Sequence, residues 1–256
     1  MTTQVKVLIE NLNVEPYASV LCYPRASEAE LKSRLEKLRE HGVTTVEFAG
    51  DASALNVPVL GKGFVGIVVT ARLGGERVAL KIRRVDADRA GLEHEAQMLA
   101  KANSVQLGPK LVGVSKNFLL MQLVEGWLLP EWLSGHRKKA QVRGVLGEVL
   151  EQCWRLDSVG LDHGELSKAP KHIIVSKQLK PFLVDFETAS VDRRPANVTS
   201  VCQFLFTSHG AVAKAVAEAL GEVNREEAIA VLRRYKNERS RENFNRVVRV
   251  CLSLRS

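Results

Sequence analysis

The chain has 256 residues, of which 45% are hydrophobic and 26% are charged, an ordinary composition for one large globular domain or two compact lobes. No apolar run approaches the roughly 20 residues of a membrane-spanning helix, and the N-terminus is too polar for a secretory signal. We therefore expect a cytoplasmic protein without a membrane partner. The four cysteines lie far apart and form no CxxC pair, which argues against a zinc site.

Residues 16–50 are predicted to form a strand, a helix and a second strand. Residues 18–22 and 43–48 are short, apolar and β-prone. Between them, Ser27 followed three residues later by Glu30 has the pattern of a capping box, which marks the start of a helix. We expect residues 1–56 to form a β-α-β extension that packs on the following lobe.

From residue 57 the pattern changes to strands separated by turns, and beyond residue 125 it becomes mainly helical. Gly74-Gly75 has the composition of a tight hairpin turn. The predicted strands are 65–71, 78–82, 109–114, 118–124 and 181–185, and the predicted helices are 87–102, 141–156 and 224–237. This order predicts an α+β protein with a β-rich lobe over residues 57–124 and an α-rich lobe over residues 125–256.

A glycine-rich motif opens the β-rich lobe. Gly61, Gly63, Gly66 and Val68 match the pattern G-x-G-x-x-G-x-V. Glycines allow the backbone to approach a polyphosphate that a Cβ atom would keep away. A dinucleotide-binding loop has three glycines as well, but it opens a helix, whereas residues 67–70 are β-prone. The motif is therefore predicted to form a strand-turn-strand loop over the phosphates of a nucleotide.

A lysine follows on the next predicted strand, in Val78-Ala-Leu-Lys81. Lys81, beneath the glycine loop, is placed to neutralise the phosphates. Such a lysine needs a carboxylate that holds it, and both Glu93 and Glu95 lie in the next predicted helix. Glu95 fits the helical pattern better and is the predicted partner, with Glu93 as the alternative.

An apolar strand then leads into an extended linker at residues 118–126. We expect backbone groups of Gln122 and Val124 to meet the edge of a bound adenine. Met121 is expected at the back of the same pocket, a position that also serves core packing.

Two further motifs lie in the α-rich lobe: His163-Gly-Glu165-Leu and, twenty residues after Glu165, Asp185-Phe-Glu187. With these and the preceding motifs, residues 57–190 resemble the protein-kinase superfamily, especially its RIO and aminoglycoside/choline-kinase-like branches and archaeal Ser/Thr-kinase-like proteins. The resemblance implies a two-lobed protein-kinase-like fold with a reduced helical C-lobe. It also implies ATP and Mg²⁺ as cofactors.

The resemblance places Glu165 where the family has its catalytic Asp. A glutamate can accept a hydroxyl proton, but its carboxylate lies one methylene further out, and a displacement of about 1 Å can cost on the order of a hundredfold in rate. Asp162, three residues earlier, is the alternative base.

The implied metal ligands also depart from the family pattern. Asp185 is expected to hold Mg²⁺, and Glu187 is either a second-metal ligand or a solvated carboxylate. The position of the family's second ligand falls on Pro170, which cannot bind a metal, or on His172 if two residues are inserted. Imidazole suits Mn²⁺ better than Mg²⁺, so we expect either one essential metal or a preference for Mn²⁺. A phosphate or second-shell contact is the alternative role of His172.

The leading expectation is thus an ATP-dependent, atypical RIO-like Ser/Thr protein kinase whose protein substrate is unknown and which also phosphorylates itself. The Asp-Phe-Glu motif and the lack of an Ala-Pro-Glu motif favour a small-molecule kinase as an alternative. The altered catalytic loop favours a third function, an ATP-binding scaffold or slow ATPase that acts on an RNA–protein assembly.

The distribution of charge fits this last alternative. The formal net charge is +8, and residues 224–256 contain nine Lys and Arg against four Asp and Glu. Such a segment attracts acidic partners. We therefore expect RNA or a ribonucleoprotein as its partner, with a solvated basic helix face as the other interpretation.

Overall fold

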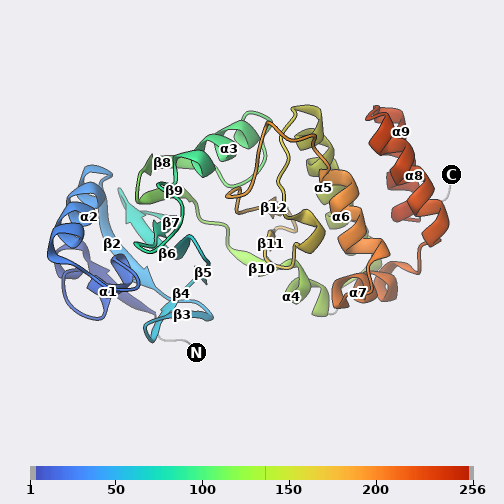
Figure 1. The fold of residues 1–256 in the computed structure, drawn as a ribbon. Coiled ribbons are helices and arrows are strands. Elements are labelled where there is room, and N and C mark those ends of the chain that lie inside the picture. Colours follow the sequence, from blue (N-terminus) through green and yellow to red (C-terminus); the bar gives the residue numbers. More distant parts are fainter. Residues whose placement is uncertain (1–3, 136, 254–256) are drawn as a thin grey trace. The chain divides into compact units, whose positions relative to one another are not determined.

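The computed structural model describes residues 4–135 and 137–253 of the chain, which divides into two compact units (Figure 1). The first unit contains the residues up to 97 together with 110–123, and the second contains 98–109 and the residues from 124 onward. The first is built around an antiparallel sheet and the second is mainly helical. The chain is therefore an α+β protein in which the sheet region comes first, as predicted.

The sheet of the first unit has the strand order β1-β2-β6-β7-β9-β8, with β5 paired to β6. Its strands are β1 (Val5–Leu8), β2 (Val43–Phe48), β5 (Gly61–Lys62), β6 (Gly66–Leu73), β7 (Glu76–Arg83), β8 (Leu111–Ser115) and β9 (Phe118–Gln122), and β3 (Ala52–Ala54) and β4 (Val57–Val59) form a separate hairpin. The predicted turn between β6 and β7 is confirmed: Gly74 and Gly75 have φ angles of +56° and +89°. Two positive φ angles are what a two-residue hairpin turn of this type requires.

The prediction of a strand at residues 18–22 is wrong. These residues fall largely in helix α1 (Tyr17–Leu21), and the first strand of the extension is β1. A short apolar run does not distinguish a buried strand from a buried helical turn, and Pro16 is the N-cap residue of this helix.

The predicted helix after Ser27 is confirmed as α2 (Glu28–Glu40). The Ser27 hydroxyl oxygen accepts a hydrogen bond from the backbone N–H of Glu30 at 3.3 Å, so one of the otherwise unpaired N–H groups of the first turn is satisfied.

The N-terminal extension completes the sheet, because β2 pairs with β6 and β1 pairs with β2. Leu38 of α2 and Phe48 of β2 belong to the same buried cluster as Ile67 and Leu80. The extension and the β-rich lobe therefore share one hydrophobic core.

Helix α3 (Glu93–Asn103) begins six residues later than the predicted start at residue 87. Gly91 lies two residues before it, and Asp86 and Asp88 lie in the irregular segment after β7. Glycine carries the highest backbone entropy cost in a helix, and Asp competes for backbone hydrogen bonds in turns, so the segment between β7 and α3 stays irregular.

The second unit contains a small antiparallel sheet and several helices. Its strands are β10 (Gly126–Leu128), β11 (Ile173–Ser176) and β12 (Pro181–Leu183), and its helices are α4 (Leu129–Ser134), α5 (Lys139–Ser158), η2 (Leu166–Lys168), α6 (Asn197–Cys202), the π-helix η3 (Gln203–Thr207), α7 (Ala211–Leu220), α8 (Arg225–Asn237) and α9 (Arg241–Cys251). The predicted helices 141–156 and 224–237 correspond to α5 and α8, and Asn224 caps α8 by accepting the Glu227 N–H. Among the described residues, no helix has both the length and the apolar character needed to cross a bilayer.

One buried arginine holds three segments of the first unit together. Arg34 of α2 is fully buried, and its Nη1 donates to the carbonyl oxygens of Leu21 at 2.7 Å and Arg83 at 2.6 Å. Its Nε donates to the carboxylate of Glu30 at 2.7 Å. The end of α1, helix α2 and the end of β7 thus meet at one guanidinium.

Substitution of this arginine tests its role. We expect Arg34→Met to lower the free energy of unfolding by about 2–5 kcal/mol, because two carbonyl groups and one carboxylate lose their shared donor. Urea unfolding measures the change. Arg39→Met, at an exposed position of the same helix, is the control, and equal stability of the two variants would contradict the assignment.

Candidate functional site

The glycine-rich motif forms the hairpin between β5 and β6. Gly61 pairs with Val68, and the Gly63 N–H donates to the Gly66 carbonyl at 2.8 Å. Phe64 lies at the tip with 93% of its surface exposed. A strand-turn-strand loop was predicted here, and this is the conformation that the motif has.

The glycines of this loop differ in how much room the surrounding atoms leave for a side chain. A Cβ atom on Gly66 would lie 2.9 Å from the Ile82 carbonyl oxygen and 3.1 Å from Cγ of Lys81. A Cβ atom on Gly61 or Gly63 would meet nothing nearer than 3.9 Å or 3.8 Å, respectively. Internal packing therefore requires only Gly66, whereas Gly61 and Gly63 have room for a side chain.

Lys81 and Glu95 form a buried ion pair within the first unit. Lys81 lies on β7 and Glu95 on α3, each is 5% exposed, and Lys81 Nζ donates to Glu95 Oε2 at 2.7 Å. Of the two glutamates considered from the sequence, the structure thus places Glu95 against Lys81, and Glu93 is exposed. Because the desolvation cost of a buried ion pair commonly equals its Coulombic gain, stability alone does not account for this pair.

The N-terminal extension also contacts the glycine-rich loop. The Tyr23 ring lies 4.5 Å from Nζ of Lys62 in the loop and 4.9 Å from the guanidinium carbon of Arg84. Arg84 in turn donates to the Gly63 carbonyl at 3.1 Å. Cations at such distances are attracted to an aromatic face, so the extension contacts the loop directly at Lys62 and, through Arg84, at Gly63.

The residues predicted to contact adenine lie at the end of β9 and directly after it. Met121 is half-buried on β9. The Gln122 N–H already donates to the Lys110 carbonyl at 2.8 Å, so it is not available to a nucleotide. Val124 forms no backbone hydrogen bond with another described residue. Of the two predicted backbone contacts, only that of Val124 still has an unused donor and acceptor.

In the second unit, Glu165, His172 and Asp185 come together. His172 Nε2 lies 3.0 Å from Glu165 Oε2 and 3.8 Å from Asp185 Oδ2. The three ligand atoms lie within 4.8 Å of one another, and all three side chains remain partly exposed. Two carboxylates and one imidazole suit a divalent cation, and this mixture of donors suits Mn²⁺ better than Mg²⁺.

The backbone at Asp185 has an unusual conformation. Its φ angle is +67°, which is uncommon for a residue other than glycine and occurs most often at Asn and Asp. The predicted strand 181–185 ends at Leu183, and the left-handed conformation turns the chain at Asp185. Such outliers cluster at functional sites because the surrounding structure must hold them.

The other two predicted residues lie outside this cluster. Asp162 is buried and accepts hydrogen bonds from Arg193 Nε at 3.0 Å and from the Ala196 N–H at 3.1 Å. These contacts tie its chain segment to the loop before α6, which is a structural role. Glu187 is half-buried two residues after Asp185. It is not a member of the Glu165–His172–Asp185 group, but one of its carboxylate oxygens lies within 4.8 Å of one of Asp185 in a second group of possible metal ligands.

His163, which precedes Glu165 by two residues, is fully buried, and its Nε2 lies 3.1 Å from the Val184 carbonyl. Burial, with a smaller contribution from neighbouring His172, lowers the pKa of His163 to about 4. The ring is therefore neutral at pH 7 and donates from Nε2. This hydrogen bond joins the segment that carries Glu165 to the segment that carries Asp185.

Asn197, which the sequence analysis did not single out, positions the same loop. Its Oδ1 accepts the His163 N–H at 2.8 Å, and its Nδ2 donates to the Leu161 carbonyl at 2.7 Å. Asn197 is 34 residues from His163 in sequence. No local sequence pattern predicts such a contact. It is recognised only in the structure, where the buried Asn197 side chain forms hydrogen bonds with the buried backbone of Leu161 and His163.

Asn197 is itself held by Asp157 of α5. The Asp157 carboxylate is 6% exposed and accepts from the N–H groups of Asn197 and Val198, from Asn197 Nδ2 and from the Tyr235 hydroxyl. Burial raises the pKa of the Asp157 carboxyl, and these hydrogen bonds oppose that change. Burial and the neighbouring Asp157 raise the pKa of Tyr235. The network connects α5, α6 and α8 with the loop before Glu165.

Gly66 provides a direct test of the loop geometry. We expect Gly66→Ala to lower the free energy of unfolding by about 1–3 kcal/mol, because the new methyl group must displace the Ile82 backbone or the Lys81 side chain. Thermal unfolding measures the loss. Gly61→Ala has room for its methyl group and serves as the control. An equal loss in both variants would show a general entropic effect instead.

Tyr235 tests the Asp157 network. At pH 7 we expect Tyr235→Phe to lower the free energy of unfolding by about 1–3 kcal/mol, the contribution of a hydrogen bond to a charged group. Tyr17→Phe is the control, because the Tyr17 ring stacks on Phe48 and its hydroxyl has no hydrogen bond to another described residue.

The pH dependence of this loss has a definite sign. A carboxyl whose pKa is raised by folding contributes stability that is complete below the unfolded pKa and declines as pH rises through the folded pKa. Tyr235→Phe removes a bond to the charged form and raises that pKa further. Urea unfolding at pH 7 and pH 4 is therefore expected to show the smaller difference from the original chain at pH 4. A difference that is independent of pH would contradict this account.

No protein-family model and no curated protein matches the chain. A functional assignment therefore depends on the chemistry and geometry of the residues described above.

Proposed function

We propose that the chain is an ATP-dependent phosphotransferase with a protein-kinase-like fold, which transfers the γ-phosphoryl group to a Ser or Thr hydroxyl, including one of its own. The observation that carries the proposal is the buried Lys81–Glu95 pair beneath the glycine-rich hairpin. An ammonium group held in this way, next to a loop with two glycines that internal packing does not require, suits the binding of phosphate oxygens.

The residues of the first unit would act together on the phosphates. Gly61 and Gly63 leave the backbone accessible, and Gly66 allows Lys81 to pass directly beneath the strand. Glu95 fixes the position of the ammonium group and offsets its charge when no nucleotide is bound. Lys81 then contributes fixed positive charge that needs no reorganisation during phosphoryl transfer.

The second unit would supply the metal ligand and the carboxylate on the acceptor side. Asp185 and His172 would hold Mg²⁺ or Mn²⁺, whose chemistry is to neutralise the phosphate oxygens. Glu165 contacts His172 through Oε2, which leaves Oε1 to orient the acceptor hydroxyl and take its proton. Asn197 and His163 keep the segment of Glu165 in place.

Transfer from γ-labelled ATP tests the proposal. Protein-bound label and free phosphate are followed with Mg²⁺ and with Mn²⁺ for the full chain, and we expect label on the protein with a higher rate in Mn²⁺. Glu165→Gln is expected to lower the rate about a hundredfold or more, the usual contribution of a general base. Asp185→Asn is expected to abolish transfer.

A matched pair on α3 separates the specific role of Glu95 from a general effect of charge. Glu95→Gln is expected to reduce transfer at least tenfold, since it removes the carboxylate that holds Lys81. Glu93→Gln, with the same change of charge on the exposed side of the helix, is expected to leave the rate unchanged. Circular dichroism verifies that each variant is folded.

The outcomes distinguish the alternatives. Free phosphate without label on the protein would indicate an ATPase, and label on an added small alcohol would indicate a small-molecule kinase. ATP binding that depends on Lys81 without turnover would favour a scaffold. Absence of ATP binding by the original chain would refute the proposal.

A further inference from the structure

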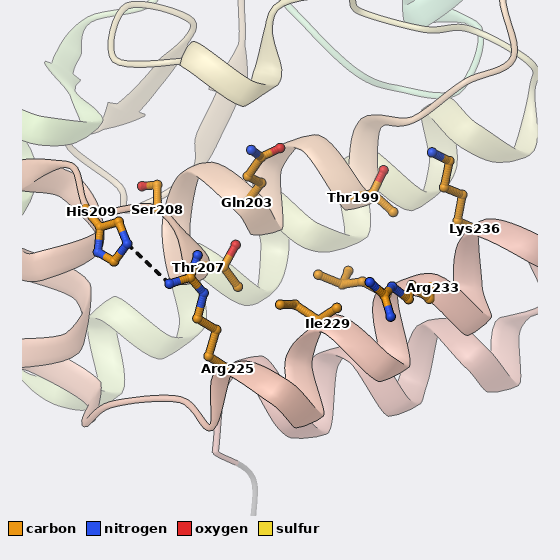
Figure 2. Close-up of a pocket in the computed structure, with 10 residues that line it drawn as sticks. Thr199, Gln203, Thr207, Ser208, His209, Arg225, Ile229, Arg233 and Lys236 are labelled. Atoms are coloured by element: carbon orange, nitrogen blue, oxygen red, sulfur yellow. Dashed lines mark hydrogen bonds between the residues drawn. The ribbon is translucent and has the colours of Figure 1, made fainter.

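A second candidate binding site lies between α6–η3 and α8 of the second unit (Figure 2). This groove has a volume of about 560 Å³. It is lined by Thr199, Gln203, Thr207, Ser208, His209, Arg225, Ile229, Leu232, Arg233 and Lys236. None of these residues belongs to the Glu165–His172–Asp185 cluster.

One wall of the groove is a row of cations on a single helix. The row begins at Arg225, and Arg233 and Lys236 follow it by 8 and 11 residues. At about 100° per residue, the three side chains share one face of α8. At about 1.5 Å per residue the row extends over roughly 16 Å. Ile229 and the buried Leu232 lie on the same face and provide an apolar floor.

These positive charges have no negative partners among the described residues. No residue that lines the groove carries a carboxylate. Arg233 and Lys236 form no ion pair with any residue in the described ranges, and the Arg225 guanidinium is held at one end by His209 Nε2 at 3.2 Å. Figure 2 shows this contact at the end of the groove opposite Lys236. The Lys236 carbonyl accepts from Arg194 at 2.6 Å, which brings a further cation to that end.

The opposite wall offers uncharged hydrogen-bonding groups. Thr199, Gln203 and Thr207 recur every four residues along α6 and η3 and face the cations across the groove (Figure 2). The Gln203 amide and the Thr207 hydroxyl have no hydrogen-bond partner among the described residues. The wide turn of η3, in which the Ser208 N–H donates to the Gln203 carbonyl at 2.9 Å, places Thr207 on this wall. Such π-turns are rare and occur frequently at functional sites.

We propose that this groove binds a ligand that carries a row of phosphate groups, either a free oligophosphate or the sugar–phosphate backbone of a nucleic acid. Arginine and lysine form strong charge-assisted hydrogen bonds with phosphate oxygens, and the amide and hydroxyl donors complete the contacts. The lining contains no Phe, Tyr or Trp, the large aromatic side chains on which bases commonly stack. Its cations and uncharged donors therefore suit contact with phosphate groups, which carries no base-sequence information.

Calorimetric titration of the full chain tests the site. The probes are inorganic tripolyphosphate and two single-stranded RNA 12-mers of different sequence, in metal-free buffer at fixed ionic strength. The test variant is Arg233→Gln with Lys236→Gln, and we expect its affinity for a bound probe to fall at least tenfold, with a shallower dependence on salt. The two RNA sequences are expected to bind equally if RNA binds at all.

The control variant is Arg234→Gln with Arg249→Gln, which removes the same charge from exposed positions that do not line the groove. Its affinity is expected to change by less than twofold. Binding of tripolyphosphate alone identifies a free oligophosphate as the ligand, and binding of RNA with the same dependence on Arg233 and Lys236 identifies a nucleic-acid backbone. Equal losses in both variants, or no binding of any probe, would overturn the proposal.

A further control separates this site from the proposed nucleotide site. Tripolyphosphate resembles the phosphates of ATP, so Lys81→Met is titrated as well. Binding in the groove is expected to be unchanged in this variant. Loss of binding in Lys81→Met with full binding in Arg233→Gln/Lys236→Gln would assign the probe to the glycine-rich hairpin and refute the groove. The groove is thus tested without any measurement of phosphoryl transfer.

Discussion

The buried carboxylate of Asp157 is the interaction on which the architecture of the second unit depends. A charge that is 6% exposed must be compensated by hydrogen bonds, and here the donors come from α6 and α8. Helix α6 has only six residues, too few to be stable without tertiary contacts. Because Asn197 both starts α6 and binds the backbone at residues 161 and 163, the charge on α5 fixes the position of the loop that carries Glu165.

The first unit uses buried charge in a different way. Arg34 is a structural group, since its donors are directed at carbonyl oxygens that end two elements. Lys81 instead points its ammonium group at the carboxylate of Glu95 beside the glycine-rich hairpin. The first arrangement stabilises the fold by satisfying backbone acceptors. The second keeps a buried charge, and the cost of its desolvation is not explained by a gain in stability alone. This contrast supports a role for Lys81 in binding an anion.

Most of the confirmed predictions came from short sequence patterns that specify turns and helix caps. The Gly74-Gly75 turn and the caps at Ser27 and Asn224 depend on residues close in the chain, whose geometry is set by backbone chemistry. The choice of Glu95 over Glu93 followed from the helical pattern, although Lys81 lies 14 residues earlier on a strand. Residues 18–22 were misassigned because apolar content alone does not separate a strand from a buried helical turn. The contacts of Asn197 and the groove on α8 involve segments far apart in sequence, and the spacing of residues along the chain does not predict them.

The position of Tyr23 has a consequence for how the hairpin at residues 61–66 moves. Its ring lies against Lys62 and Arg84, and Arg84 binds the Gly63 carbonyl. Any displacement of the segment between α1 and α2 therefore changes the freedom of the hairpin, and ordering of the hairpin in turn restrains that segment. Thermodynamic linkage makes this relation reciprocal. Through Tyr23, the N-terminal extension and the glycine-rich hairpin thus restrain each other's motion.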